Sequence, residues 1–232
     1  MSHERENITG ARKGSGRRLE LEDFIRINTV VEAPKLVPEI RLHLAPEMRP
    51  LWRATESYRN QMKVDAPFWA FAWVGGQVLA RYILDNQEMV AGRNVIDIGC
   101  GGGIVSIAAV LAGAEHVTAL DIDPLASTVC RLNAQLNLTA AHITTHTANA
   151  ITYDFTPFDL ILVGDVCYTR GEAADLTHTL RQAAAPVLFG DPGRRFFPLQ
   201  GVRQLASYTV ETTWELEASD VTEAGVWHMV EL

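Results

Sequence analysis

A glycine-rich turn between two apolar stretches constrains this 232-residue chain more than any other feature. Residues 97–103 have the sequence Asp-Ile-Gly-Cys-Gly-Gly-Gly; they follow the apolar run 94–96 and precede a stretch with helical apolar spacing at 104–111. Glycines at alternate positions let the backbone turn tightly and let a ligand lie against the main chain, where any Cβ would collide. The pattern predicts a strand, a turn and a helix, with a ligand held on bare backbone at the turn.

The spacing of these glycines disfavours two familiar classes of ligand. The dinucleotide fingerprint needs a third glycine at position 104, where this chain has Ile104, and the phosphate-loop pattern needs a Gly-Lys-Ser/Thr that does not follow here. The turn is G-x-G-x-G, with Gly99, Gly101 and Gly103 as its glycines. A nucleoside without a pyrophosphate fits better than a nicotinamide cofactor, so a dehydrogenase is a disfavoured alternative.

An acid after the next expected strand supports a nucleoside ligand. Residues 116–120 are typical of a strand, and it ends at Asp121, which lies 121 − 99 = 22 residues after Gly99. A carboxylate that holds a ribose follows the first glycine by about 20 residues in dinucleotide-binding folds, and it can accept charge-assisted hydrogen bonds from both vicinal hydroxyls. We therefore predict Asp121 as the ribose ligand, with Ile122 beside it.

The rest of the chain alternates expected strands and helices, which indicates an α/β fold with a parallel sheet covered by helices on both faces. Asp123 and Pro124 suit the start of a helix, as N-cap and first-turn proline. We expect further strands at 143–147, 158–163 and 186–190, helices at 124–136 and 172–184, and a closing antiparallel pair at 208–216 and 226–232. Upstream we expect a short strand at 40–44 and helices at 47–60 and 76–84.

Polar residues gather where the expected strands end, which is where open α/β sheets bind ligands. Asn149 and Ala150 follow one strand and are predicted to face the adenine, and Asp165 follows another. A ligand with a ribose diol, an adenine and no phosphate grip is most simply S-adenosylmethionine. Methyl transfer is therefore the predicted chemistry.

Composition and charge limit the partners. The net charge of −8 offers no basic footprint for nucleic acid and suits a basic or lysine-bearing protein better. Three cysteines without paired spacing indicate a reducing compartment, and the scattered histidines predict no metal. No apolar run approaches the roughly 20 residues of a membrane span. We expect a cytoplasmic monomer, with the mitochondrial matrix as the alternative for a eukaryotic chain.

The expected domain organisation is simple. Residues 1–18 carry five basic residues, three glycines and almost nothing apolar, which predicts a flexible basic arm. Residues 19–232 form one domain, in which 19–90 is an N-terminal extension that contributes to the cofactor and substrate sites.

An acid followed after one residue by G-x-G-x-G resembles the first motif of the seven-β-strand (class I) methyltransferases. A closer resemblance covers the chain from Phe24 onward and rests on the segments 38–44, 67–73, 75–77, 79–82 and 190–194. These segments are similar to those of the electron transfer flavoprotein β-subunit lysine methyltransferase family. The resemblance implies a Rossmann-like fold with a mostly parallel seven-stranded sheet and a C-terminal antiparallel hairpin.

The resemblance also implies the reaction and its residues. Asp165-Val166-Cys167-Tyr168 matches the acid and aromatic that mark this protein-lysine methyltransferase group after the fourth strand. The implied activity is N-methylation of lysines on the β-subunit of the electron transfer flavoprotein. Asp165 would orient the lysine amine and help to disperse its proton, while Tyr168 and Trp73 would wall the channel and exclude water.

Several alternatives stay open from the residues. Asp97 would either accept from the methionine ammonium of the cofactor or order the glycine turn. Asp165 could instead cap a helix, and Tyr168, Phe68 and Trp69 could pack in the core. Arg194 or Arg195 could touch acidic residues of a partner.

Other functions also remain open. A small-molecule N-methyltransferase and a non-catalytic cofactor-binding protein share this cofactor half. The chain departs from the family at Val74, where a proline is frequent, and at Asn149, where many class I enzymes have an acid.

Overall fold

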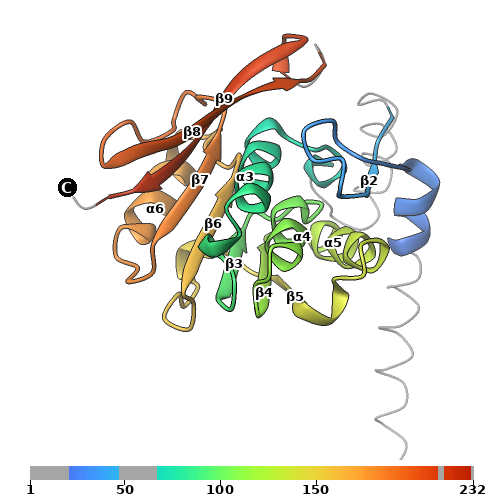
Figure 1. The fold of residues 1–232 in the computed structure, drawn as a ribbon, viewed down its shortest axis with the longest axis horizontal. Helices are drawn as coiled ribbons and strands as arrows, with labels where there is room; N and C mark the ends of the chain where they lie inside the picture. Colours follow the sequence, from blue (N-terminus) through green and yellow to red (C-terminus); the bar gives the residue numbers. More distant parts are fainter. Residues whose placement is uncertain (1–20, 47–66, 214–216, 231–232) are drawn as a thin grey trace, which may run out of the picture.

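The computed structural model describes residues 21–46, 67–213 and 217–230, and its centre is a seven-stranded sheet (Figure 1). The strand order is β5-β4-β3-β6-β7-β9-β8. The first five strands are parallel to one another, whereas β9 runs antiparallel to both β7 and β8. The predicted α/β architecture with a C-terminal antiparallel hairpin is confirmed.

The strand bounds follow the sequence pattern closely in the parallel part of the sheet. The strands are β3 (Asn94–Ile98), β4 (His116–Asp121), β5 (Ile143–Thr147), β6 (Leu160–Gly164) and β7 (Val187–Asp191), followed by β8 (Val202–Glu211) and β9 (Val221–Met229). Strand β6 is the fourth of seven and is buried along nearly its whole length, as a strand covered on both faces should be.

Two apolar cores, one on each face of the sheet, explain why the sequences of the central strands are continuously apolar. Val95, Leu160 and Leu162 pack with helices α3 (Val74–Asp85) and α4 (Ile104–Leu111), whereas Ile96 and Ile161 pack with α6 (Arg170–Leu180). Successive strand residues point to opposite faces, so each strand feeds both cores. In Figure 1, α3, α4 and α5 (Pro124–Leu136) cover one face, and α6 lies on the other.

Helix α5 begins as its sequence predicts. The Asp123 side chain accepts a hydrogen bond from the backbone N–H of Leu125, and Pro124 occupies the first turn, where its missing N–H costs nothing. Strand β4 ends at Asp121, so the cap also fixes where the chain leaves the sheet edge.

We expect Asp123→Ala to lower the free energy of unfolding by about 1 kcal/mol, because it removes this cap. Urea denaturation followed by circular dichroism measures the change. Asp154→Ala is the matched control: Asp154 makes a similar local bond to the Thr156 N–H, but on an exposed turn outside any helix. Equal losses in the two variants would contradict the capping role.

A small hairpin of two strands packs beside α5, and the sequence predicted only one of these strands. The expected strand at 40–44 is β2 (Leu42–Leu44), and it pairs antiparallel with β1 (Val30–Glu32), which the sequence did not predict. Asn137, the C-cap of α5, accepts from the N–H of Arg41 and donates to its carbonyl, and Asn133 of α5 accepts from the N–H of His43. Helix α5 thus holds the hairpin against the sheet.

Three predicted bounds were wrong. Helix α6 ends at Leu180 rather than at 184, because the chain needs residues 181–186 to turn back into β7 and Pro186 disfavours helix in the residue before it. The two C-terminal strands each begin five or six residues earlier than expected, and an irregularity near Gln204 hides the alternation of β8. The predicted arm at 1–18 and helix at 47–60 lie outside the described residues.

The start of α3 packs backbone to backbone on the sheet. A Cβ on Gly75 would lie 2.3 Å from the Gly190 carbonyl oxygen, and a Cβ on Gly190 would lie 2.0 Å from the Gly75 carbonyl oxygen. Likewise, a Cβ on Gly164 would lie 3.2 Å from the Gly76 Cα. Only glycines allow this approach. It brings the N-terminus of α3 to the carboxyl ends of β6 and β7.

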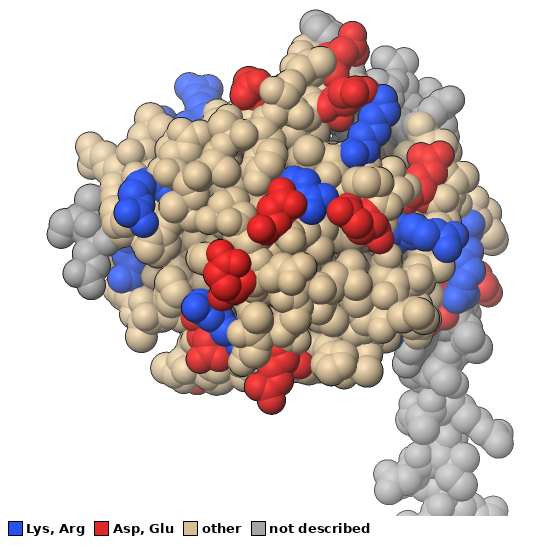
Figure 2. All heavy atoms as spheres, viewed as in Figure 1, with Lys and Arg blue, Asp and Glu red and all other residues tan. Residues whose placement is uncertain are grey.

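The surface carries mixed charge on the face that Figure 2 shows, with acidic and basic side chains interspersed rather than gathered by sign. Ion pairs such as those of Arg81 with Glu39 and Asp85 account for part of this arrangement. Within the ranges that the structure describes, no helix has the length and apolarity that crossing a bilayer requires.

Candidate functional site

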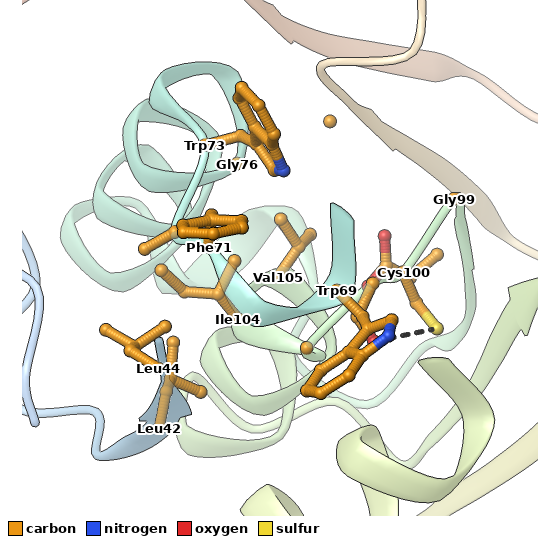
Figure 3. A pocket seen from close by; sticks show the side chains of 15 residues that line it. Leu42, Leu44, Trp69, Phe71, Trp73, Gly76, Gly99, Cys100, Ile104 and Val105 are labelled. Carbon is orange, nitrogen blue, oxygen red and sulfur yellow. Dashed lines mark hydrogen bonds between the residues drawn. The ribbon is translucent and has the colours of Figure 1, made fainter. Parts of the chain in front are cut away.

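A pocket opens at the glycine turn (Figure 3). Its wall combines the turn after β3 with the segment before α3 and with β2. The lining residues include Leu42, Trp69, Phe71, Trp73, Asp97 and the backbone of 99–102. The predicted turn, the aromatic segment 67–73 and the N-terminal extension therefore meet at one place.

The glycines of the turn serve different purposes. Gly99, Gly101 and Gly103 all have positive φ, at 68°, 49° and 81°, which other residues adopt at a cost. A Cβ at Gly103 would lie 2.5 Å from the Cys130 sulfur, and one at Gly99 would lie 2.6 Å from a Val166 methyl carbon. A Cβ at Gly101 would instead meet nothing nearer than the Trp69 Cα at 3.7 Å, which is an ordinary van der Waals contact. Of these three glycines, Gly101 is therefore the one whose missing side chain is not explained by a collision within the protein, and its backbone lines the pocket.

Asp121 lies at the end of β4, beside the turn. Its carboxylate accepts from the backbone N–H of Gly101 at 2.9 Å and from that of Asp123 at 3.0 Å. Burial is the main cause that raises the pKa of Asp121, and these backbone hydrogen bonds oppose it. The two bonds fix the orientation of the carboxylate and leave lone pairs on both oxygens for a ligand.

Asp97 is almost wholly buried under the same turn. One of its oxygens accepts from the Ser106 N–H at 3.0 Å and from the Ser106 hydroxyl at 2.6 Å. Burial raises the pKa of Asp97 to about 7, although the bonds from Ser106 lower it. Asp97 therefore ties β3 to the first turn of α4, in agreement with the expectation that it orders the glycine turn. No basic side chain pairs with it among the ion pairs of the described residues.

Asn149, Ala150 and Ile122 lie at the same sheet edge. The N–H of Ala148 donates to the Asp121 carbonyl, so the chain after β5 runs beside the end of β4. Asn149 accepts from the Ile151 N–H and begins a short 3-10 turn that starts at Ala150. Ile122 is 62% exposed. Their predicted contacts with adenine stay predictions.

Asp165 follows β6 in a conformation that is unusual for a residue other than glycine. Its φ is +55°, in the left-handed region, and its side chain is buried. One oxygen accepts from the Gly75 N–H at 3.0 Å, so Asp165 caps the start of α3 across the sheet edge. The cap that was an alternative at this position exists, but for a helix that precedes Asp165 by 90 residues. Strain of this kind is characteristic of functional sites.

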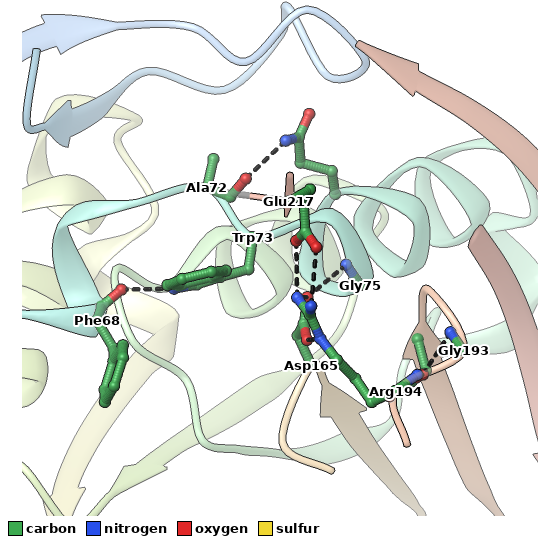
Figure 4. Close-up of polar contacts among 10 residues, drawn as sticks. Phe68, Ala72, Trp73, Gly75, Asp165, Gly193, Arg194 and Glu217 are labelled. Atoms are coloured by element: carbon green, nitrogen blue, oxygen red, sulfur yellow. Dashed lines mark hydrogen bonds and ion pairs between the residues drawn. The ribbon is translucent and has the colours of Figure 1, made fainter. Parts of the chain in front are cut away.

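Asp165 also binds Arg194, which lies in the turn after β7 (Figure 4). The guanidinium donates to both oxygens of Asp165, at 2.6 and 3.1 Å, and to both oxygens of Glu217, at 2.8 and 2.7 Å. The sequence left open whether Arg194 or Arg195 meets acidic residues of a partner, and in the structure the hydrogen bonds of Arg194 go to two acidic residues of its own chain. The corresponding expectation for Arg195, which is exposed beside Phe196, stays a prediction.

An aromatic group borders Asp165. Phe68 lies 6.0 Å from Trp73 and 5.8 Å from Tyr168, measured between ring centroids, and the Trp73 N–H donates to the Phe68 carbonyl. Phe68 and Tyr168 are 42% and 53% exposed, so neither is simply core, whereas Trp69 is 1% exposed. Burial, and then the carboxylates of Asp121, Glu172 and Asp165, raise the pKa of Tyr168. The Tyr168 hydroxyl therefore stays protonated at neutral pH.

Two residues that hold the site in shape were missed from the sequence. Asn133 of α5 is fully buried and donates to the Gly102 carbonyl while it accepts from His43, so it links the glycine turn to β2. Ser106 holds Asp97. The only available signal was a polar residue on an otherwise apolar helix face, which is too common to single out either one.

Comparisons with known proteins agree with this geometry. The family of ribosomal protein L11 methyltransferases (PrmA) matches residues 78–164, the segment that holds the glycine turn and Asp121. Among solved structures, magnesium protoporphyrin IX methyltransferase from Synechocystis, determined with bound SAM, superimposes with a TM-score of 0.53. It is 19% identical, and the match covers 68% of this chain and 81% of that one. This likeness shows the fold.

Two relatives match nearly end to end. The electron transfer flavoprotein beta subunit lysine methyltransferase of Xenopus laevis is 37% identical over 88% of this chain and 85% of its own length. The human protein of the same name is 33% identical over 93% of this chain and 85% of its own length. On this evidence the chain belongs to the electron transfer flavoprotein beta subunit lysine methyltransferase family.

Proposed function

We propose that this protein transfers methyl groups from S-adenosylmethionine to lysine side chains of the β-subunit of an electron transfer flavoprotein. The observation that carries the proposal is the meeting of Asp165, Trp73 and Tyr168 at the sheet edge that also holds the glycine turn and Asp121. Relatives named for this substrate, at 33–37% identity over most of the chain, supply its identity.

The residues present fit this cofactor. Gly101 presents open backbone, Asp121 has free lone pairs beside it, and Asp97 is a buried carboxylate that could receive an ammonium. The indole N–H of Trp69 is buried in the pocket wall and has no hydrogen-bond partner among the described residues. A buried donor without a partner is costly, which indicates that a polar ligand belongs there. Asp121 would hold the ribose, and Asp97 would face the amino acid portion.

The chain's own residues have a limited chemical task. S-adenosylmethionine, when bound, supplies a methyl group already activated by its sulfonium. Only a neutral lysine amine attacks it, and with an ordinary pKa near 10.4 roughly one lysine in a thousand or fewer is neutral at pH 7. The site must therefore admit the amine, align it and keep water out.

Asp165 suits orientation better than proton storage. Its oxygens already accept three hydrogen bonds, from Gly75 and from two nitrogens of Arg194. An oxygen that accepts one bond has a second lone pair free, and this one can receive an N–H of the incoming amine. The faces of Trp73 and Tyr168 attract an alkylammonium chain and shape the approach. The amine then loses its proton to solvent before it enters.

The state of Asp97 predicts a pH dependence of cofactor binding. The pKa of Asp97 is about 7, and a bound ammonium favours the ionised form, so below about pH 7 binding must expel a proton. We expect the affinity for S-adenosylhomocysteine to fall toward tenfold per pH unit below about pH 7 and to be flat above it. Titration calorimetry of wild type and Asp97→Asn measures this, and the slope should vanish in the variant. A slope that survives would belong to Asp121 and would contradict the assignment.

Intact-mass spectrometry tests the proposed function. Purified electron transfer flavoprotein, incubated with the enzyme and S-adenosylmethionine, should gain whole methyl increments on its β-subunit, and substitution of the modified lysines by arginine should abolish the gain. A parallel incubation with small heteroaromatic amines tests the alternative of a small-molecule N-methyltransferase. Methylation of the amines with an unmodified flavoprotein would overturn the proposal.

The proposal includes a reducing compartment and a monomeric protein. The absence of paired cysteine spacing supports a reducing compartment such as the cytoplasm, with the mitochondrial matrix as the alternative. We propose that the protein acts as a monomer on a protein partner without nucleic acid or membrane. Light scattering coupled to gel filtration checks the monomer.

A further inference from the structure

Arg194 is the centre of a buried cluster that joins three distant parts of the chain. Its guanidinium binds Asp165 at the end of β6 and Glu217 in the connection between β8 and β9, with two hydrogen bonds to each. The carboxylate side chains are 3% and 5% exposed, and that of Arg194 is 22% exposed. Two-pronged pairs of this kind fix geometry as well as charge.

The turn that carries Arg194 is built to aim it. Asp191 accepts from the backbone N–H groups of Gly193 and Arg194 at 2.7 and 2.6 Å, and Gly193 has a φ of +86°. Burial raises the pKa of Asp191 to about 6, while its backbone bonds and the nearby Arg194 oppose the rise. This arrangement explains the Gly-Asp-Pro-Gly-Arg segment at 190–194 as a rigid turn with a directed arginine.

The hydrogen bonds of the guanidinium go to carboxylates of the chain. Its carbon also lies over the Trp73 ring, 5.9 Å from the centroid, so the guanidinium makes a cation–π contact with the aromatic residue beside Asp165. Asp165 directly follows Gly164, which lines the pocket, and it has a left-handed conformation that costs free energy. The contacts that hold this conformation are the hydrogen bond from its own N–H to the Gly190 carbonyl and the bonds that its side chain accepts from the Gly75 N–H and from Arg194.

We propose that Arg194 is a positioning residue: by binding Asp165 and Glu217 at once, as a clamp, it holds Asp165 at the N-terminus of α3 beside Trp73 and ties Glu217 to the end of β6. The proposal deepens the proposed function and rests on it for the role of Asp165. The clamp itself is a statement about structure that can be tested without methyl transfer.

The test compares Arg194→Ala with Arg81→Met. Arg81 is a matched control, because it also binds two carboxylates, Glu39 and Asp85, but on the outer face of α3. In Arg194→Ala we expect kcat on the flavoprotein to fall about tenfold to a hundredfold, with KM and the dissociation constant of S-adenosylhomocysteine changed less than about threefold. Guanidinium chloride at concentrations below denaturation should restore part of kcat in this variant and leave Arg81→Met unaffected.

A second, milder substitution keeps the proposal testable if Arg194→Ala does not fold. Arg194→Lys keeps the charge but has no planar fork, so it cannot make both two-pronged contacts, and its kcat should lie between those of wild type and Arg194→Ala. Wild-type kcat in both Arg194 variants would overturn the proposal, as would a lowered kcat that guanidinium does not restore.

Hydrogen exchange separates failure of this proposal from failure of the proposed function. Without Arg194, peptides that cover the first turn of α3 and residues 217–220 should exchange faster, and those of α5 should not. If wild type methylates no lysine, the proposed function falls, and the exchange result alone decides the clamp. Unchanged exchange in both segments of Arg194→Ala would refute the clamp whatever the activity.

Discussion

Replacement of Asp165 by alanine is expected to lower the turnover number about a hundredfold, while the affinity for S-adenosylhomocysteine changes only a few-fold. Asp165 follows β6, and the oxygen that accepts only the Arg194 Nε–H keeps a free lone pair near the aromatic group of Phe68, Trp73 and Tyr168. A misplacement of reacting atoms by about 1 Å can cost a factor of this size. The ribose and turn contacts of the cofactor lie elsewhere, at Asp121 and Gly101.

Steady-state kinetics with the flavoprotein as substrate measures this effect, and calorimetry measures the affinity. Because Asp165→Ala also removes the acceptor for the Gly75 N–H, some stability is lost, and Asp123→Ala controls for that loss. Asp123→Ala removes the N-cap of α5 but leaves the substrate side of the site intact, so its turnover should stay near wild type. Wild-type turnover in Asp165→Ala would remove Asp165 from the mechanism.

The sequence predicted the parallel half of the fold well because two independent patterns agree there. The strands β3 and β4 and the helices α4 and α5 are each marked by an apolar pattern and also by a local signal at an end, such as the glycine turn or Asp123 with Pro124, and β5 is marked by a β-branched run. Where only one pattern was present, bounds shifted. Strand β8 has an irregular stretch near Gln204, and α6 stops early to let the chain return to the sheet.

The arrangement around Asp165 could not be predicted, because each contact joins segments far apart in the sequence. The Gly75 N–H meets Asp165 because glycines at 75 and 190 let α3 approach β7 at backbone distance, and Arg194 meets both Asp165 and Glu217. The sequence shows the glycines and the arginine but not their partners. The same reasoning explains why the sequence could not tell whether Arg194 meets acidic residues of its own chain or of a partner.

Replacement of Asp121 by alanine is expected to weaken the binding of S-adenosylhomocysteine about a hundredfold or more. Two charge-assisted hydrogen bonds to a ribose diol contribute about 3 kcal/mol together, and alanine removes both. The carboxylate is already oriented by the N–H groups of Gly101 and Asp123, so a ligand does not have to order it on binding. Titration calorimetry at a fixed pH above about 7 avoids the linked ionisation of Asp97.

A 2′-deoxy analogue of S-adenosylhomocysteine distinguishes loss of the ribose contact from a disturbed turn. Wild type should bind the analogue much more weakly than the parent compound, because one hydroxyl is missing, whereas Asp121→Ala should bind the two with nearly equal affinity. If Asp121 acts only by shaping the Gly101 turn, the variant would still discriminate between the two ligands as strongly as wild type does, because its contact with the diol would lie on another residue. Asp123→Ala, which removes the neighbouring helix cap, should keep the wild-type discrimination.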